Sequence, residues 1–66
     1  MRLIVNGDEI EIVAKTITQL VETFEMRPEG LVVQLNQEIM EREAWEKTNL
    51  QDGDNIELLK FVGGGA

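Results

Sequence analysis

The chain has 66 residues, is 42% hydrophobic and carries a formal net charge of −7. This length suffices for one domain with a thin core, and the apolar content is typical of a folded protein. There is no Cys and no His, which excludes disulfides and zinc-type sites, and the scattered Lys and Arg residues argue against nucleic acid as a partner.

The side chains that remain offer little catalytic chemistry. Hydroxyl nucleophiles are present on threonines, but the chain contains no histidine that would activate them. We therefore expect no enzymatic activity, no bound cofactor and no bound metal. The apolar stretch at the start is too short for a signal peptide and no run could span a membrane, so a cytoplasmic protein without a membrane partner is expected.

The first predicted element is a β-hairpin over residues 2–13. The sequence Asn6-Gly7-Asp8 is a strong signal for a hairpin turn, and the residues that follow alternate between polar and apolar with the period of a strand. The side chains expected to face the core are Leu3, Val5, Ile10 and Ile12.

A helix is predicted from Ile17 to Glu25. Thr16 and Gln19 fit a capping box, in which Thr16 is the N-cap and Gln19 returns a hydrogen bond to it. The turn sequence that starts at Pro28 excludes a longer helix. The apolar face of this helix is formed, at helical spacing, by Ile17, Leu20, Val21 and Phe24.

Two strands joined by a tight turn are predicted next. Residues 31–35 alternate with their apolar side chains on one face, and residues 38–40 form a short strand at a sheet edge. Residues 42–50 have no clear period, and we expect a single helical turn there with Trp45 and Leu50 tucked inward.

The last strand is predicted at residues 55–61, after a turn at Asp52-Gly53-Asp54. Ile56 and Leu58 should face inward, and Leu59 and Phe61 should lie on the other face. The element order β-β-α-β-β-β predicts an α+β protein with a β-grasp (ubiquitin-like) fold, in which a mixed sheet of four to five strands carries one main helix on one face. This domain is expected to span residues 1–62.

A tail follows the domain at residues 63–66, with the sequence Gly63-Gly64-Gly65-Ala66. Glycine runs are also typical of frayed chain ends. A segment without side chains can, however, enter a narrow channel of another enzyme and present its carboxylate there. An ATP-dependent partner could convert that carboxylate to an acyl-adenylate, and a sulfur nucleophile could displace AMP to leave a thiocarboxylate.

Three segments carry a family resemblance: MRLIVNG at residues 1–7, LNQEIMEREAW at residues 35–45, and DGDNIELLKFVGGG at residues 52–65. Over essentially its full length the sequence resembles the ThiS family, the ubiquitin-like sulfur carriers of thiamine biosynthesis. Arg42 and Trp45 in the middle segment mark this resemblance more specifically than the glycines. We expect them to serve in local packing and a surface ion pair.

The resemblance implies that Gly65 carries the reactive carboxylate, with Gly64 and Gly63 extending the tail. It further implies that an E1-like adenylyltransferase activates this group with ATP, that sulfur comes from a cysteine desulfurase system, and that thiazole synthase accepts it. The family's mature chains end on glycine, whereas this chain ends on Ala66. Either Ala66 is trimmed, which we favour, or Ala66 itself carries the carboxylate.

A docking patch for partner enzymes is predicted beside the tail. Leu59 and Phe61 precede the tail and are expected on the face away from the helix, with Ile4 joining them from the neighbouring strand. The alternative is that Phe61 folds back onto the sheet edge.

Three other functions share these features. A small subunit of molybdopterin synthase would use the same tail chemistry within a lasting complex. A protein modifier would join its tail to lysines of target proteins. A plain β-grasp interaction domain would keep its function after deletion of the tail.

Overall fold

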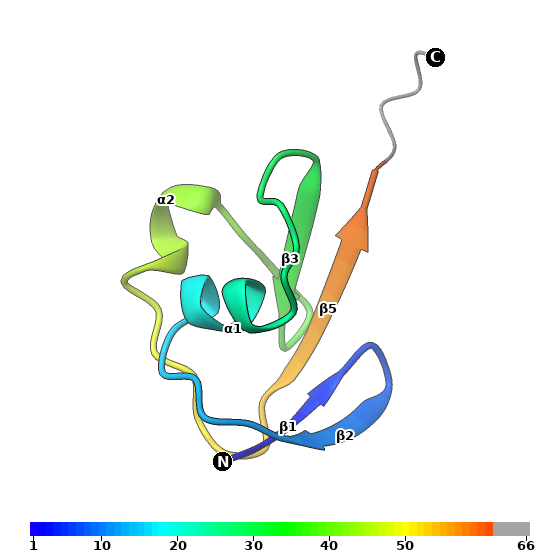
Figure 1. The fold of residues 1–66 in the computed structure, drawn as a ribbon, viewed down its shortest axis with the longest axis vertical. Coiled ribbons are helices and arrows are strands. Elements are labelled where there is room, and N and C mark those ends of the chain that lie inside the picture. Colours follow the sequence, from blue (N-terminus) through cyan, green and yellow to red (C-terminus); the bar gives the residue numbers. More distant parts are fainter. Residues whose placement is uncertain (62–66) are drawn as a thin grey trace.

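A computed structural model describes residues 1–61. In chain order the elements are β1 (Arg2–Val5), β2 (Asp8–Glu11), α1 (Ile17–Thr23), β3 (Leu31–Leu35), β4 (Glu38–Met40), α2 (Arg42–Trp45) and β5 (Asn55–Lys60) (Figure 1). The strands form one sheet in the order β2-β1-β5-β3-β4. The β1–β5 pair is parallel and the other pairs are antiparallel. This arrangement, with α1 as the main helix, confirms the predicted β-grasp fold. The predicted boundary after residue 62 lies outside the described residues.

The N-terminal hairpin forms as predicted from the sequence. Asn6 and Gly7 have positive φ values of 51° and 86°, which a tight turn between right-twisted antiparallel strands requires. Leu3 and Val5 are buried, and the other two predicted core residues pack against the core from partly buried positions: Ile10 and Ile12.

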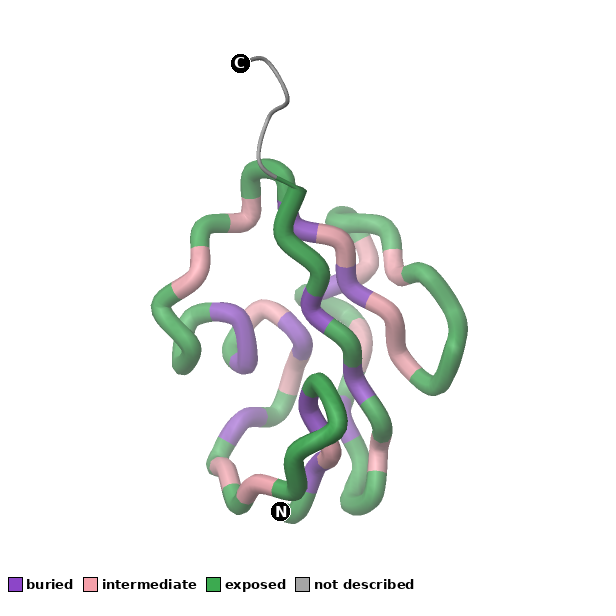
Figure 2. The backbone as a smooth tube through the Cα atoms, turned by 90° about the vertical axis from the view of Figure 1, so that its right-hand side faces the viewer, coloured by how far each residue is buried: buried purple, intermediate pink, exposed green. Residues whose placement is uncertain are grey.

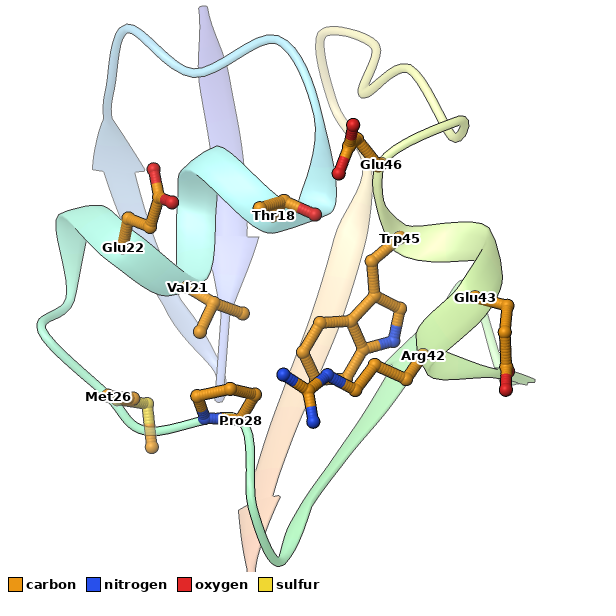
Figure 3. Close-up of a pocket in the computed structure, with 9 residues that line it drawn as sticks. All are labelled: Thr18, Val21, Glu22, Met26, Pro28, Arg42, Glu43, Trp45 and Glu46. Carbon is orange, nitrogen blue, oxygen red and sulfur yellow. The ribbon is translucent and has the colours of Figure 1, made fainter.

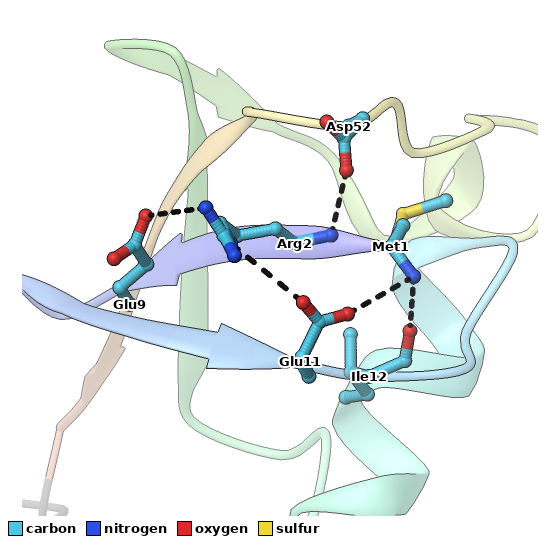
Figure 4. Close-up of polar contacts among 6 residues, drawn as sticks. All are labelled: Met1, Arg2, Glu9, Glu11, Ile12 and Asp52. Atoms are coloured by element: carbon cyan, nitrogen blue, oxygen red, sulfur yellow. Dashed lines mark hydrogen bonds and ion pairs between the residues drawn. The ribbon is translucent and has the colours of Figure 1, made fainter.

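Backbone and ionic contacts hold the N-terminus against the end of β2 (Figure 4). The Met1 ammonium donates a hydrogen bond to the Ile12 carbonyl at 2.9 Å, and the Ile12 N–H donates to the Met1 carbonyl at 2.9 Å. The Arg2 guanidinium lies 3.6 Å from the carboxylates of both Glu9 and Glu11. Because exposed ion pairs add little stability, the backbone bonds are the more important part of this contact.

The N-terminus of α1 is capped by Thr16, whose hydroxyl accepts a hydrogen bond from the Gln19 N–H at 3.2 Å. The predicted N-cap is therefore confirmed. The return bond differs from the prediction, because Gln19 Oε1 accepts from the Lys15 N–H at 2.7 Å. The backbone of Thr16 forms a β-bridge with Asn49. The Gln19 side chain accepts instead from the backbone N–H of Lys15, the residue before the N-cap.

α1 ends at Thr23, two residues before the predicted end at Glu25. Glu25 has a φ of 58° and its N–H donates to the Glu22 carbonyl at 2.9 Å, while the Met26 N–H donates to the Val21 carbonyl at 3.2 Å. These two bonds form a Schellman C-cap, which usually has glycine at the position that Glu25 occupies. The early end of the helix therefore has no glycine signal in the sequence.

Because α1 is shorter than predicted, its buried apolar face has fewer residues than predicted. Ile17, Leu20 and Val21 are buried as predicted. Phe24 is the C-cap residue and is 38% exposed, so its predicted place on the buried face is wrong. The left-handed residue that follows ends the helical repeat before Phe24 can pack like the other three.

The second half of the fold agrees with the predicted elements. β3 and β4 join through Asn36 and Gln37, which have positive φ values of 51° and 73°, and β4 lies at the sheet edge. α2 is the expected helical turn. Trp45 on it is 4% exposed and its Nε1–H donates to the Met40 carbonyl at 2.9 Å; Leu50 is buried as well.

The hydrophobic core lies between α1 and one face of the sheet (Figure 1). Its largest fully buried side chains come from α1 and the three inner strands: Leu3, Ile17, Leu20, Val33 and Ile56. On the opposite face of these strands, the described side chains are exposed or partly exposed. That open face is where the candidate site begins.

Candidate functional site

β5 leads to the C-terminal tail and lies in the middle of the sheet. β3 pairs along its length and β1 pairs with its start. The Asn6 side chain continues the contact with β1: its Oδ1 accepts from the Leu58 N–H at 2.8 Å and its Nδ2 donates to the Leu58 carbonyl at 3.3 Å. The strand that leads to the tail is therefore bonded on both sides as far as Leu58 and to β3 alone beyond it.

Buried and exposed residues alternate along β5 (Figure 2). Ile56 and Leu58 are buried, whereas Leu59 and Phe61 are 42% and 64% exposed. At this exposure Phe61 does not fold back under the sheet edge. Leu59 pairs with Val32 on β3, which is partly buried. We call Val32, Leu59 and Phe61 the apolar strip.

Ile4 lies on the same face but does not join the apolar strip. Its partner in the parallel ladder is Asn55, at the start of β5. Leu59 is four residues farther along the strand, a distance of about 13 Å. Alternation indicated the correct face for Ile4, but the register of β1 against β5 places it at the other end of the strand.

Ile39 is a neighbour of the strip that our sequence reasoning missed. It is 60% exposed on β4 and pairs with Gln34, which shares a face of β3 with Val32. The period of two along these strands could have placed it there. Ile39 is therefore a further exposed apolar side chain on this face at the β4 edge, in a row in which polar Gln34 and Glu57 follow on β3 and β5.

The predicted reactive residues, 63–66, lie outside the described residues, so the assignments to Gly65 and Ala66 remain predictions. The last described contact before them is the hydrogen bond from the Phe61 N–H to the Gly30 carbonyl, at 2.9 Å. It lies one position beyond the final β3–β5 pair, Leu31 with Lys60.

A groove of about 500 Å³ separates α1 from α2 (Figure 3). Val21 and Trp45 line it with buried apolar surface, and the side chain of Arg42 extends into it. The predicted packing role of Trp45 is confirmed. For Arg42, the predicted surface ion pair is absent among residues 1–61, where the ionic contacts involve Met1 and Arg2.

Other kinds of site receive no support from the described part of the chain. No helix within residues 1–61 is both long and apolar enough to cross a bilayer. Across the same residues, no three carboxylates gather in a cluster suited to a metal ion. Every buried polar side-chain atom described there has a hydrogen-bond partner.

The mixed five-stranded sheet, the single main helix on one face and the central strand that continues into a glycine tail define a ubiquitin-like β-grasp domain. The sequence model of the ThiS family matches residues 3–65. This chain belongs to the ThiS family.

Named relatives agree with this assignment. The chain is 33% identical over 66 residues to the sulfur carrier protein ThiS of Escherichia coli, covering 98% of this chain and 100% of the relative. It is 36% identical over 50 residues to ThiS of Bacillus subtilis, with 76% of each chain covered. It is also 30% identical over 67 residues to a thiazole synthase of Paramagnetospirillum magneticum; that match covers the whole of this chain and 21% of the synthase.

Solved structures have the same fold. The crystal structure of the thiamine biosynthesis protein ThiS from Geobacter metallireducens superposes with a TM-score of 0.85 at 38% identity, covering 98% of this chain and all of that one. The solution structure of a thiamine biosynthesis protein from the same organism gives a TM-score of 0.81 at 36% identity, covering 100% and 90% of the two chains.

Proposed function

We propose that this protein is a sulfur carrier of thiamine biosynthesis. The observation that carries the proposal is the family match over residues 3–65, which includes the three tail glycines. The E. coli sulfur carrier, covered over its whole length, supports it. A carrier of this kind is a substrate of other enzymes and needs no catalytic side chain of its own, which agrees with a sequence without Cys or His.

The proposed reactive group is the C-terminal carboxylate of Gly65. Its oxygen attacks the α-phosphate of ATP, pyrophosphate leaves, and an acyl-adenylate remains. A hydrosulfide-type nucleophile then attacks the carbonyl carbon, the bond to AMP breaks and the chain ends in a thiocarboxylate. Gly63 and Gly64 suit this role because a partner's backbone can approach a residue without Cβ closely.

Three partners follow from this chemistry. An E1-like adenylyltransferase supplies the ATP-dependent step, and a cysteine desulfurase system supplies the sulfur. Thiazole synthase receives it. A thiazole synthase of which 21% is similar to this chain supports the last assignment, because that polypeptide contains a carrier-like region of its own.

We propose the apolar strip as the docking surface for these enzymes. Leu59 and Phe61 are exposed, apolar and adjacent in sequence to the tail, so a partner that covers them also receives the tail. Apolar and aromatic side chains that become buried on binding commonly dominate the affinity of an interface. Ile4 on β1, which pairs with Asn55 at the start of β5, would lie at the rim of this contact.

The direct test is incubation of the protein with ATP, the adenylyltransferase and sulfide, followed by intact-mass analysis of the C-terminus. We expect one oxygen to be replaced by sulfur. The control is a chain that lacks residues 64–66, which should fold normally and remain unmodified. The chain tested ends on Gly65, the mature length proposed here. If it stays unmodified under conditions in which the E. coli carrier is converted, the proposal is contradicted.

The family match ends at residue 65, one residue before Ala66, and this supports trimming of Ala66. Intact-mass analysis of the protein from its native host measures the mature length directly. We expect a chain that ends on Gly65. A thiocarboxylate found on a chain that retains Ala66 would show that trimming is not required.

A further inference from the structure

We propose that Gly30, in the turn before β3, is a positioning residue for the adenylation reaction, because it fixes the Phe61 peptide group at the end of the described chain. The inference rests on the proposed carrier function. Gly30 is about thirty residues away from the tail in sequence, and the fold brings it beside Phe61, the last described residue before the tail.

Two contacts join Gly30 to the end of β5. The Phe61 N–H donates to the Gly30 carbonyl at 2.9 Å, and this bond adds one position to the ladder that ends at the Leu31–Lys60 pair. On the other side, a Cβ built on Gly30 would lie 3.0 Å from the Phe61 carbonyl oxygen. The Phe61 peptide group thus fits against a residue that has no side chain.

The local turn explains why Gly30 presents its backbone in this way. The Leu31 N–H donates to the Pro28 carbonyl at 3.1 Å, which closes a turn around Gly30. Gly30 has a φ of 73°, a conformation that glycine adopts without strain. Phe61 is the residue from which the chain continues to Val62 and the glycines, so its peptide group is the point at which the domain joins the segment with the proposed reactive carboxylate.

The chain contains matched controls for this idea. Gly53 and Gly7 also have positive φ, 89° and 86°, but a Cβ on either would meet nothing within 4 Å. Alanine at any of the three positions introduces the same kind of backbone strain. Only Gly30→Ala also presses on the residue that leads into the tail.

The experiment compares wild type, Gly30→Ala and Gly53→Ala in the adenylation reaction, each as a chain that ends on Gly65, the mature length proposed above. We expect the melting temperature to drop in both variants and to drop further in Gly30→Ala, because its Cβ also presses on the Phe61 carbonyl. We expect kcat to fall on the order of tenfold to a hundredfold for Gly30→Ala alone, because a small displacement of a reacting group is costly. KM should change less than kcat, because the substitution removes no side chain of the apolar strip. The ¹⁵N–¹H signal of Phe61 should shift in Gly30→Ala and stay in place in Gly53→Ala.

Equal losses of kcat in the two variants, or no loss in either, would overturn the inference. If Gly30→Ala fails to fold, hydrogen exchange of the wild type decides: an unprotected Phe61 amide removes the contact on which the proposal depends, and a protected one supports it. Wild type that is not adenylated at all contradicts the carrier function itself, which is a different outcome from equal behaviour of the two variants.

Discussion

The two faces of β5 differ in burial: the side chains on one face lie in the core, and those on the other face are exposed to solvent. Ile56 is fully buried and Leu58 is 5% exposed, and both belong to the core under α1. Leu59 on the other face is 42% exposed, and Phe61, one residue beyond the strand, is 64% exposed. The inward pair stabilises a thin core, and the outward pair is available to a partner at the base of the tail.

In the function proposed above, this contrast lets a domain of 66 residues combine stability with a docking surface. In a strand, successive side chains point to opposite faces, so one strand can supply both functions without a dedicated binding loop. The backbone on either side of Leu59 is paired with β3, up to the hydrogen bond from the Phe61 N–H to the Gly30 carbonyl, and this pairing supports the outward side chains.

The largest effect on stability is expected for Ile56→Ala on the inward face. Removal of a fully buried side chain of this size should lower the free energy of unfolding by about 2–5 kcal/mol, measured by urea denaturation. The matched control on the outward face, Leu59→Ala, should cost less than about 1 kcal/mol. Equal losses for the two variants would contradict the division of roles along β5.

The double variant Leu59→Ser/Phe61→Ser tests the outward face. We expect its affinity for thiazole synthase and for the adenylyltransferase to fall at least about tenfold, equivalent to about 1.4 kcal/mol. Calorimetric titration measures this directly. Val13→Ser is the control, because Val13 is an apolar side chain, 95% exposed, that lies outside the strip. Full affinity in the folded double variant would remove the docking surface.

The smallest effect is expected at the helix cap, away from both faces of β5. Thr16→Ala removes the hydroxyl that accepts from the Gln19 N–H and should lower the free energy of unfolding by about 1 kcal/mol. Partner affinity should be unchanged. Thr23→Ala is the control: its hydroxyl donates to a carbonyl already within the helix, so thermal denaturation should show a smaller loss.

The sequence by itself determined the element types and order, the hairpin turn at Asn6-Gly7 and the cap at Thr16. These features depend on periodicity and local turn chemistry, which act over a few neighbouring residues. The same period assigned Leu58 and Leu59 to opposite faces of the sheet. The glycine tail was also recognised from the sequence, because a run of glycines requires no knowledge of the fold to identify.

Only the tertiary structure decided which residues from distant segments meet. The parallel register of β1 with β5 placed Ile4 beside Asn55 and away from the strip. The left-handed conformation of Glu25 ended α1 early without a glycine signal. Gly30 reached Phe61 because the antiparallel pairing of β3 with β5 brings the start of one strand beside the end of the other. Such contacts depend on how the strands align in space, and no local pattern encodes that alignment.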